Sequence, residues 1–364
     1  MRVALIHYWL VTMRGGEKVL ESLCRLFPQA DIFTHVCVPE NLSATLRSRR
    51  IKTSFIQKLP FSVRAYQKYL PLMPLALEQL DLRGYDLVIS SESGPAKGVL
   101  THSQTPHICY CHTPMRYLWD FYQDYLQEAS PLIRPLVRLL THRLRLWDVL
   151  SANRVDHFIA NSHNVARRIA RHYRREAEVI HPPVEVDLFT PKGDLRPPDP
   201  AAPLVYLGQL TGYKRADLAI LACSRMNKPL LVIGRGPEEA RLRSLAGPCV
   251  AFLGSLERAD VVGHLQNCSA LIFPGEEDFG LVPVEAMAAG RPVVAYARGG
   301  ATETVREGLS GLFFQEQSVE SLQQALERLE TMSFDPAAII RQARTFSEAA
   351  FAEAFMNLVR RATG

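Results

Sequence analysis

The sequence has no long hydrophobic run, no recognisable secretion signal and no paired arrangement of cysteines. The absence of a stretch of about 18 apolar residues argues against a transmembrane helix. Residues 1–7 lack the long apolar core and cleavage site of a secretion signal. The seven cysteines, an odd number, are scattered through 364 residues, which indicates reduced thiols rather than a disulfide framework. These features predict a cytoplasmic protein.

The sequence also carries little net charge. A value of +5 suits a diphosphate ligand or an anionic membrane surface, but it is too small to indicate nucleic acid as a partner. The content of hydrophobic residues, 47%, is that of an ordinary globular protein. The length of the chain predicts about two domains.

Cys109, Cys111 and His112 lie close enough in the sequence to raise the question of a metal site. Successive residues of a strand point to opposite faces, and the sequence offers no second cluster of ligands. Buried strand cysteines are therefore favoured over a zinc site. We expect neither a metal nor another cofactor.

In the N-terminal half, apolar runs alternate with helical patterns. The run 3–6 is followed by a glycine turn at 14–16 and by a periodic stretch at 17–27, which predicts strand, turn and helix. Further strand-like runs lie at 86–90, 107–111 and 157–161. This alternation predicts a Rossmann-like α/β domain with a parallel sheet, which we assign to residues 1–185.

A proline-rich stretch at 186–203 is predicted to be a linker. Beyond it, an α/β domain is predicted at 204–346, and an amphipathic helix at about 347–364 is expected to pack back on the first domain. The second domain is indicated by strand-like runs at 204–207, 230–233, 250–253, 270–273 and 292–295. Two doubly wound sheets predict a central cleft between the domains, with ligands at the carboxyl ends of the strands.

The strongest functional signal is segment 274–299, PGEEDFGLVPVEAMAAGRPVVAYARG. It predicts a buried strand that ends at Phe273, a loop at 275–280 and a short helix at 285–289 that Gly290 terminates. Pro283 lies near the helix start, where its missing N–H costs nothing. Loop amides at a helix N-terminus would form a site for anions and hydroxyl groups.

Two carboxylates, Glu277 and Glu285, flank this loop. Paired carboxylates are typical of glycoside hydrolysis. Here they lie beside a predicted anion site, which favours one carboxylate near a sugar and the other on ribose hydroxyl groups. The simpler alternative is a helix-capping loop with two solvated glutamates.

The segment closely resembles the signature of retaining family 4 glycosyltransferases, in which two glutamates are separated by seven residues. These enzymes have the GT-B fold. The resemblance implies that Glu277, Phe279, Gly280 and Leu281 contact the sugar of the donor, partly through main-chain amides. It also implies that Glu285 contacts the ribose.

Two further loops fit this resemblance. Segment 206–215, YLGQLTGYKR, is similar to the loop in which an arginine and a lysine contact the diphosphate. Lys214 matches the lysine, but Gln209 stands where the arginine usually is, so either Arg215 supplies the second charge or that contact is missing. Lys214 and Arg215 could instead be a plain charge pair at a helix start. Gly234 resembles the family's next glycine turn, and a lone turn glycine is the alternative.

In the N-terminal half, Gly15, Gly16 and Glu17 resemble the glycine loop that approaches the donor phosphates and the acceptor. Glycine there permits close approach of the backbone, although a simple strand–helix turn would use it too.

Segment 111–120, CHTPMRYLWD, looks like the corresponding segment of bacterial polysaccharide mannosyltransferases within this family. The resemblance implies that His112 lies near the acceptor, and we place Glu17, Arg116 and Tyr117 on the same side. A structural histidine is the alternative for His112.

The resemblance implies a retaining, metal-independent hexosyltransferase with His112, Lys214 and Glu277 as catalytic residues. We expect it to move mannose from GDP-mannose onto a saccharide, in particular a lipid-linked one, in the synthesis of a surface polysaccharide or glycolipid. A UDP-sugar enzyme of the same fold, a sugar-nucleotide epimerase and a non-catalytic sugar-nucleotide binder remain alternatives. Basic and apolar segments at 52–82 and 131–147 would either lie on an anionic membrane, at its inner face, or pack within the domain.

Overall fold

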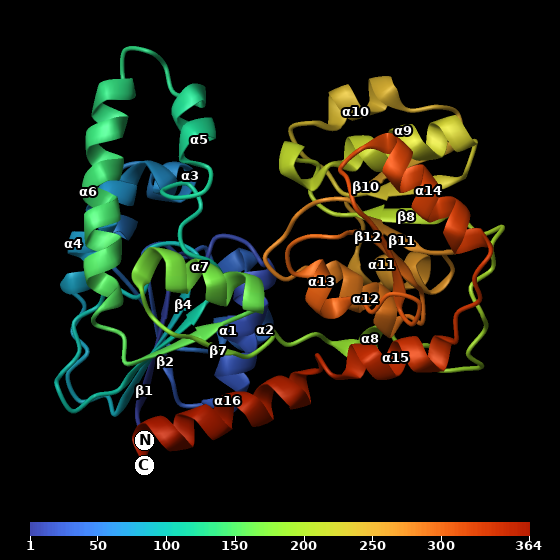
Figure 1. The fold of residues 1–364 in the computed structure, drawn as a ribbon. Helices are drawn as coiled ribbons and strands as arrows, with labels where there is room; N and C mark the ends of the chain where they lie inside the picture. Colours follow the sequence, from blue (N-terminus) through green and yellow to red (C-terminus); the bar gives the residue numbers. More distant parts are fainter. The chain divides into compact units, whose positions relative to one another are not determined.

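The computed structural model describes residues 1–364, with the exception of the side chain of Glu128. The chain forms two compact units. The first comprises Met1–His181 and Ala352–Gly364, and the second comprises Pro182–Phe351. Each unit is a parallel sheet covered by helices (Figure 1).

The first unit contains a seven-stranded sheet with the order β3-β2-β1-β4-β5-β6-β7. All of its paired neighbours run parallel. The inner strands β1, β4 and β5 are buried along their whole length, as expected where helices cover both faces of a sheet. The strands are β1 Val3–His7, β2 Asp31–Thr34, β3 Ile51–Thr53, β4 Leu87–Glu92, β5 His107–Cys111, β6 His157–Ala160 and β7 Glu178–Val179.

The helices of the first unit include α6, which is amphipathic, and the C-terminal helix α16. They are α1 Gly15–Leu26, α2 Ala44–Arg47, α3 Ser62–Ala65, α4 Met73–Glu78, α5 Tyr122–Glu128, α6 Arg134–Ala152, α7 His163–Tyr173 and most of α16 Glu348–Thr363. Phe355 of α16 is fully buried, and its ring meets that of Phe27 edge to face at 6.4 Å between centroids. The apolar face of α16 therefore belongs to the core of the first unit.

The second unit contains a six-stranded parallel sheet with the order β10-β9-β8-β11-β12-β13. In this doubly wound order the chain reverses direction across the sheet between β8 and β11. Open α/β sheets commonly bind ligands at the carboxyl ends of the strands beside such a point. The strands are β8 Leu204–Leu207, β9 Leu230–Ile233, β10 Val250–Gly254, β11 Leu271–Phe273, β12 Val293–Tyr296 and β13 Gly311–Phe314.

Two hydrophobic clusters fill the two faces of this second sheet. One joins the sheet to α9 Ala216–Met226, α10 Glu239–Leu245 and α14 Val319–Glu330. The other joins it to α8 Val186–Phe189, α11 Arg258–Gln266, α12 Leu281–Ala288, α13 Ala301–Thr304 and α15 Pro336–Arg344.

Segment 186–203, for which a linker is expected, begins with the short helix α8. Val186 and Phe189 of this helix are buried in the core of the second unit. Farther along, Arg196 O accepts a hydrogen bond from Arg291 Nη1 at 3.3 Å. This stretch is thus attached to the second unit at both of these points.

Nearly all the strands predicted from apolar runs are present within about one residue of their expected ends. β2, β3, β7 and β13 were not predicted. β3 and β7 lie at the edges of their sheet and are short and partly exposed, so their sequences lack a continuous apolar run. Among the helices that the structure describes, none is long and apolar enough to cross a membrane.

We predict that Phe355→Ala destabilises the first unit by about 3–5 kcal/mol, because it removes a buried ring and leaves a cavity. Asn357→Ala on the exposed face of the same helix is the control, with an expected change within about 0.5 kcal/mol. The three tryptophans, Trp9, Trp119 and Trp147, all lie in the first unit, so the urea dependence of their fluorescence measures its unfolding. Equal midpoints for the two variants would contradict the packing of α16.

Candidate functional site

The loops that follow the strands of the second sheet come together at its carboxyl edge through close backbone contacts. A Cβ on Gly234, whose φ is +135°, would lie 1.9 Å from Gly208 O. A Cβ on Gly300 would lie 2.2 Å from Phe279 Cα. Both distances are far below van der Waals contact, so no side chain fits at either glycine. The loop after β9 thereby packs on the loop after β8, and the loop after β12 packs on the loop after β11.

Lys214 and Glu277, both predicted to be catalytic, form an ion pair at this edge. Lys214 Nζ lies 2.8 Å from Glu277 Oε1, and the two side chains are 17% and 22% exposed. A Cβ on Gly275 would lie 2.9 Å from Lys214 Cα, so the glycine lets the two loops approach. Behind the pair, burial raises the pKa of the Tyr206 phenol, and the charge of Glu277 acts in the same direction. The structure therefore brings the lysine loop and the first glutamate into direct contact.

Helix α12 starts earlier than predicted, at Leu281 rather than at Glu285. Gly280 precedes it with a φ of +84°, a conformation that glycine adopts without strain. Glu285 thus lies within the helix, and its Oε1 accepts a hydrogen bond from Arg258 Nη1 at 3.3 Å. Arg258 also contacts Glu185 Oε2 at 2.5 Å. The sequence analysis did not identify Arg258, because α11 has no motif and only the fold brings it to Glu285.

The segment between the two glutamates turns the side chain of Phe279 into the core of the second unit. The ring of Phe279 is buried and meets Phe346 at 5.6 Å between centroids. Gly300 N donates a hydrogen bond to Glu277 O at 2.8 Å, which fixes the start of this segment. If Phe279 contributes to ligand binding, it does so through its peptide groups, as the resemblance implies.

Arg215 and Gln209 differ in their surroundings. Arg215 has a φ of +53°, and its Nε donates to Asp217 Oδ1 at 3.1 Å. Gln209 is exposed, and its carbonyl oxygen accepts a hydrogen bond from Thr211 N at 3.0 Å. The guanidinium of Arg215 is therefore held by a carboxylate on its own helix, while Lys214 is the cation beside Glu277.

In the first unit, four polar residues form a hydrogen-bonded chain at the carboxyl ends of β1, β4 and β5. His7 Nε2 lies 3.5 Å from Glu17 Oε1, and His7 Nδ1 lies 3.2 Å from Ser91 Oγ. Ser91 Oγ lies 2.9 Å from His112 Nε2. We call these residues the His7–Ser91 chain. The chain joins Glu17 and His112, which were both predicted to lie on the acceptor side. The connecting residues, His7 and Ser91, were not predicted.

The glycines before this chain lie where α1 begins. Gly15 is the first residue of the helix. A Cβ on Gly16 would lie 2.4 Å from the Tyr8 hydroxyl and 3.6 Å from His112 Nε2, so a side chain there would displace the Tyr8 hydroxyl and crowd the His7–Ser91 chain.

The charges in the His7–Ser91 chain differ between its two ends. Burial alone would raise the pKa of Glu17, but the hydrogen bond and charge of His7 and main-chain N–H groups outweigh it and hold the pKa below its ordinary value. Burial lowers the pKa of His112 to about 3, and the charge of His7 acts in the same direction. At neutral pH, Glu17 is therefore ionised and His112 is neutral.

Arg116 and Tyr117 contact residues of their own segment. The Tyr117 hydroxyl donates to Met115 Sδ at 2.8 Å, and the Arg116 guanidinium lies over the Phe121 ring at 4.9 Å from its centroid. These contacts give the segment after His112 a compact local fold, and they do not assign either residue to a ligand.

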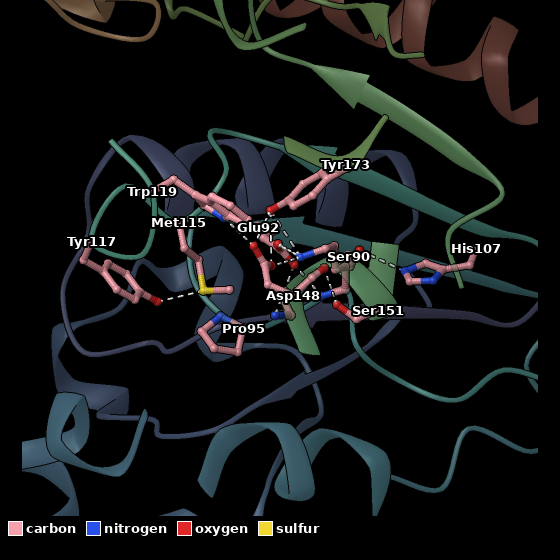
Figure 2. Close-up of polar contacts among 12 residues, drawn as sticks. Ser90, Glu92, Pro95, His107, Met115, Tyr117, Trp119, Asp148, Ser151 and Tyr173 are labelled. Atoms are coloured by element: carbon pink, nitrogen blue, oxygen red, sulfur yellow. Dashed lines mark hydrogen bonds and ion pairs between the residues drawn. The ribbon is translucent and has the colours of Figure 1, made fainter. Parts of the chain in front are cut away.

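A buried polar network that includes Glu92, Trp119 and Asp148 lies in the first unit (Figure 2). It supports the strand end that carries His112. Lys97 Nζ lies 2.7 Å from Glu92 Oε1 and also contacts Asp148. Trp119 Nε1 donates to Asp148 Oδ2 at 2.8 Å, and Glu92 O accepts from His112 N at 2.7 Å. Burial would lower the pKa of Lys97, but the two carboxylates outweigh it and raise the pKa, so Lys97 remains charged. Lys97 was not predicted, because it belongs to no motif.

The cysteines of β5 lie in a hydrophobic cluster and not in a metal site. Cys109 and Cys111 share this cluster with Phe158 and Val165, and burial raises the pKa of both thiols. No group of three or more histidine, cysteine, aspartate or glutamate residues is arranged to hold a metal in the described part of the chain.

A cavity of about 520 Å³ lies at the opposite edge of the second sheet, where the strands begin. It is lined mainly by apolar residues and prolines, among them Pro198, Leu326 and Phe334. Its charged lining residues, Lys228 and Glu330, pair with each other. We favour the carboxyl edge as the functional site, because parallel α/β sheets bind ligands there and the convergent polar groups lie there.

Two descriptions of known families match the chain. Residues 13–188 match Glycosyltransferase Family 4, and residues 192–346 match Glycosyl transferases group 1. D-inositol 3-phosphate glycosyltransferase of Mycobacterium leprae is 30% identical over 221 residues, which cover 55% of this chain and 50% of that protein. The chain thus spans about half the length of the curated relatives it matches.

Solved structures of low sequence identity share the whole fold. The lipopolysaccharide outer core galactosyltransferase WaaB matches with a TM-score of 0.68 and 17% identity, over 99% of both chains. HepE of Anabaena in complex with UDP-glucose matches with a TM-score of 0.69 and 17% identity, over 99% of this chain and 100% of that chain. Sucrose-phosphate synthase of Thermosynechococcus elongatus matches with a TM-score of 0.72 and 19% identity, over 99% and 98%.

These likenesses and the two parallel sheets establish the GT-B fold, as predicted. The first part of the chain is therefore similar to Glycosyltransferase Family 4, and the second part is similar to Glycosyl transferases group 1.

We predict that Gly300→Ala displaces the segment at 277–281, because the added methyl group would lie 2.2 Å from Phe279 Cα. Hydrogen exchange of peptides that cover 276–284 should become faster than in the unmodified protein. The control is Gly263→Ala in α11, where an added Cβ meets no atom within 4 Å. Equal protection of the segment in the two variants would show that the glycine contact does not hold it.

Proposed function

We propose that the chain is a retaining, metal-independent glycosyltransferase that moves a sugar from a nucleoside diphosphate onto a saccharide acceptor. The observation that supports this most directly is the Lys214–Glu277 pair at the carboxyl edge of the second sheet, beside the start of α12. The two residues belong to the segment that matches Glycosyl transferases group 1.

The proposed donor site uses the groups of this edge in three roles. Lys214 neutralises the diphosphate, and the main chain of Phe279, Gly280 and Leu281 together with Glu277 contacts the sugar. Glu285 contacts the ribose. Because Lys214 is paired with Glu277, a diphosphate competes with the carboxylate for the ammonium group. Binding therefore releases Glu277 from this pair and leaves it able to accept hydrogen bonds from the sugar.

The proposed reaction keeps the anomeric configuration of the sugar. The acceptor hydroxyl attacks the anomeric carbon on the face that the diphosphate leaves, and a phosphate oxygen takes the proton of that hydroxyl. The protein contributes electrostatic stabilisation of the departing charge, which is commonly the largest single term in such catalysis. His112 and Glu17 in the first unit are proposed to contact the acceptor side.

GDP-mannose is our proposed donor, because segment 111–120 looks like that of bacterial polysaccharide mannosyltransferases. A UDP-sugar is the second candidate, since HepE, which shares the fold, was solved with UDP and with UDP-glucose. The acceptor is proposed to be a lipid-linked saccharide of a surface polysaccharide or glycolipid.

Thermal unfolding with GDP, UDP, ADP and their sugars tests the function and separates these donors. A ligand that binds only the folded protein at about 100 times its dissociation constant stabilises it by about 2.7 kcal/mol. We expect GDP and GDP-mannose to raise the melting temperature most. Incubation of the same donor with and without saccharide acceptors then distinguishes transfer from epimerisation, which needs no acceptor. No shift with any nucleotide would contradict the proposal.

We predict that Lys214→Ala lowers kcat about 10²–10³-fold, because one donor of electrostatic stabilisation is lost from the transition state. Glu285→Ala is expected to be severely impaired as well. Lys228→Ala is the matched control, since Lys228 lies at the opposite edge of the same sheet and pairs with Glu330. Near-normal turnover of either site variant at saturating donor would remove the site assignment.

An apolar and basic surface on α6 is proposed to bind an anionic membrane. Leu136 on α6 is 56% exposed, and Leu132, in the turn just before this helix, is 92% exposed. Arg138 and Arg143 are exposed on the same helix. Leucines that reach into the interface next to arginines that meet lipid phosphates are the expected combination for a peripheral membrane helix.

We predict that vesicles rich in phosphatidylglycerol sediment the protein at low salt and release it as the salt concentration rises, because surface charges are screened. Leu136→Ser should weaken this binding. Leu188→Ser is the control, since Leu188 is an exposed leucine of the second unit. Absence of binding at every salt concentration, or equal weakening by both variants, would contradict the proposed surface.

A further inference from the structure

In the His7–Ser91 chain, both ring nitrogens of His7 and one ring nitrogen of His112 have hydrogen-bond partners. These partners determine which of the nitrogens carry protons. His7 is fully buried, Ser91 is 1% exposed, and Glu17 is 2% exposed. Water therefore has little access to these three residues, so their polar atoms need hydrogen-bond partners within the protein.

The end at Glu17 fixes one proton of His7. Glu17 Oε2 accepts from Arg14 N at 2.9 Å, and Oε1 faces His7 Nε2. An ionised carboxylate can only accept hydrogen bonds, so Nε2 of His7 carries a proton whether the ring is neutral or charged. The charge of His7 therefore depends on its other nitrogen, Nδ1, which faces Ser91 Oγ.

Ser91 couples the charge of His7 to the tautomer of His112, because its hydroxyl group has a single hydrogen and can donate to only one of the two rings. When His7 is charged, Nδ1–H donates to Ser91 Oγ, and the hydroxyl hydrogen points to His112 Nε2. Since His112 is then neutral with an accepting Nε2, its proton is on Nδ1. When His7 is neutral, its bare Nδ1 accepts the hydroxyl hydrogen, and Ser91 Oγ accepts from a protonated His112 Nε2. The proton of His112 has then left Nδ1.

We propose that His7 and Ser91 are positioning residues that set which ring nitrogen of His112 carries its proton. A charged His7 makes His112 Nδ1 a hydrogen-bond donor, and a neutral His7 makes it an acceptor. The role of this nitrogen in contacting an acceptor rests on the proposed function, but the coupling between the two histidines does not. The ionisable groups facing His7 are Tyr8 on its own strand, Glu17 on α1 and His112 after β5.

The test is ¹⁵N NMR of the full chain labelled at histidine, between about pH 5 and about pH 9, which brackets the usual range of histidine titration. His7→Gln and His112→Gln assign the signals. We expect the protonated and bare nitrogens of His112 to exchange identities at the pH at which His7 titrates, while His112 stays neutral. A His112 that keeps one tautomer throughout, or a His7 that does not titrate, would overturn the proposal.

Two variants separate coupling from a general change in structure. Ser91→Ala should abolish the response of His112 to His7. Ser90→Ala is the matched control, because Ser90 lies on the same strand, is buried, and bonds His107 Nε2 at 2.9 Å instead. Glu17→Gln removes a negative charge, so the exchange should move to lower pH. A response of His112 that survives in Ser91→Ala would also overturn the proposal.

The same variants distinguish this inference from the function it serves. If transfer is detected, the pH profile of kcat/KM should lose one ionisation in Ser91→Ala and keep it in Ser90→Ala. If NMR shows the coupling but no donor is turned over, the proposed function fails and the proton coupling stands. If transfer occurs while His112 keeps one tautomer, the function stands and the coupling fails.

Discussion

Backbone crowding at the carboxyl edge of the second sheet is the constraint on which the candidate donor site depends. The parallel register brings the ends of β8, β9, β11 and β12 to one edge, so four loops compete for the same space. They fit only because glycine stands at Gly234, Gly275 and Gly300, where a Cβ would lie less than 3 Å from a neighbouring loop. The close approach of these loops is therefore a property of their backbones, and a side chain at any of the three glycines would force them apart.

The crowded loops hold one ion pair between them, that of Lys214 and Glu277. Lys214 and Glu277 are partly exposed at 17% and 22%, so both remain within reach of water and of a ligand. Their attraction is screened more than that of a fully buried pair, which makes the pair exchangeable. Under the proposed function, such a pair could open when the diphosphate binds and re-form when it leaves.

The candidate site residues that could be proposed from the sequence lie close together along the chain. Glu277, Gly280 and Glu285 belong to one loop and one helix, and their spacing carries the resemblance. Arg258 and His7 could not be found in this way, because their partners, Glu285 and Ser91, are 27 and 84 residues distant and meet only through the folded sheets. For the same reason the start of α12 was placed too late: the sequence showed a helical run from Glu285, and the conformation of Gly280 that allows an earlier start is a property of the packed loop.

The fold was easier to predict than the site, because a buried parallel strand has an apolar run that can be recognised in the sequence without knowledge of its neighbouring strands. The strands that were not predicted show where apolar runs fail as a signal. β2, Asp31–Thr34, opens with a charged residue, and β3, Ile51–Thr53, is partly exposed at the sheet edge. Their pairing with β1 comes from register with a neighbour and not from their own hydrophobicity.

The charged groups near the strand ends have different surroundings in the two units. In the second unit the charges are partly solvated. In the first, Lys97, Glu92 and Asp148 are removed from water entirely. Such burial is poor evidence for added stability, because the cost of desolvation is often as large as the attraction between the charges, and apolar residues of similar volume commonly serve as well. Apolar residues could not, however, form the directional hydrogen bonds that fix the positions of neighbouring groups.

The Glu92 carboxylate accepts from Lys97 N at 2.6 Å, while its carbonyl accepts from His112 N, so one residue fixes both the loop after β4 and the residue after β5. Asp148 extends the same network to Trp119, at the end of the segment that His112 begins. The network thus holds His112 from two sides along the chain, at its own amide and seven residues later. The chain of hydrogen bonds from His7 through Ser91 can fix a proton on His112 only if the imidazole stays within hydrogen-bonding distance, and the buried charges provide that restraint.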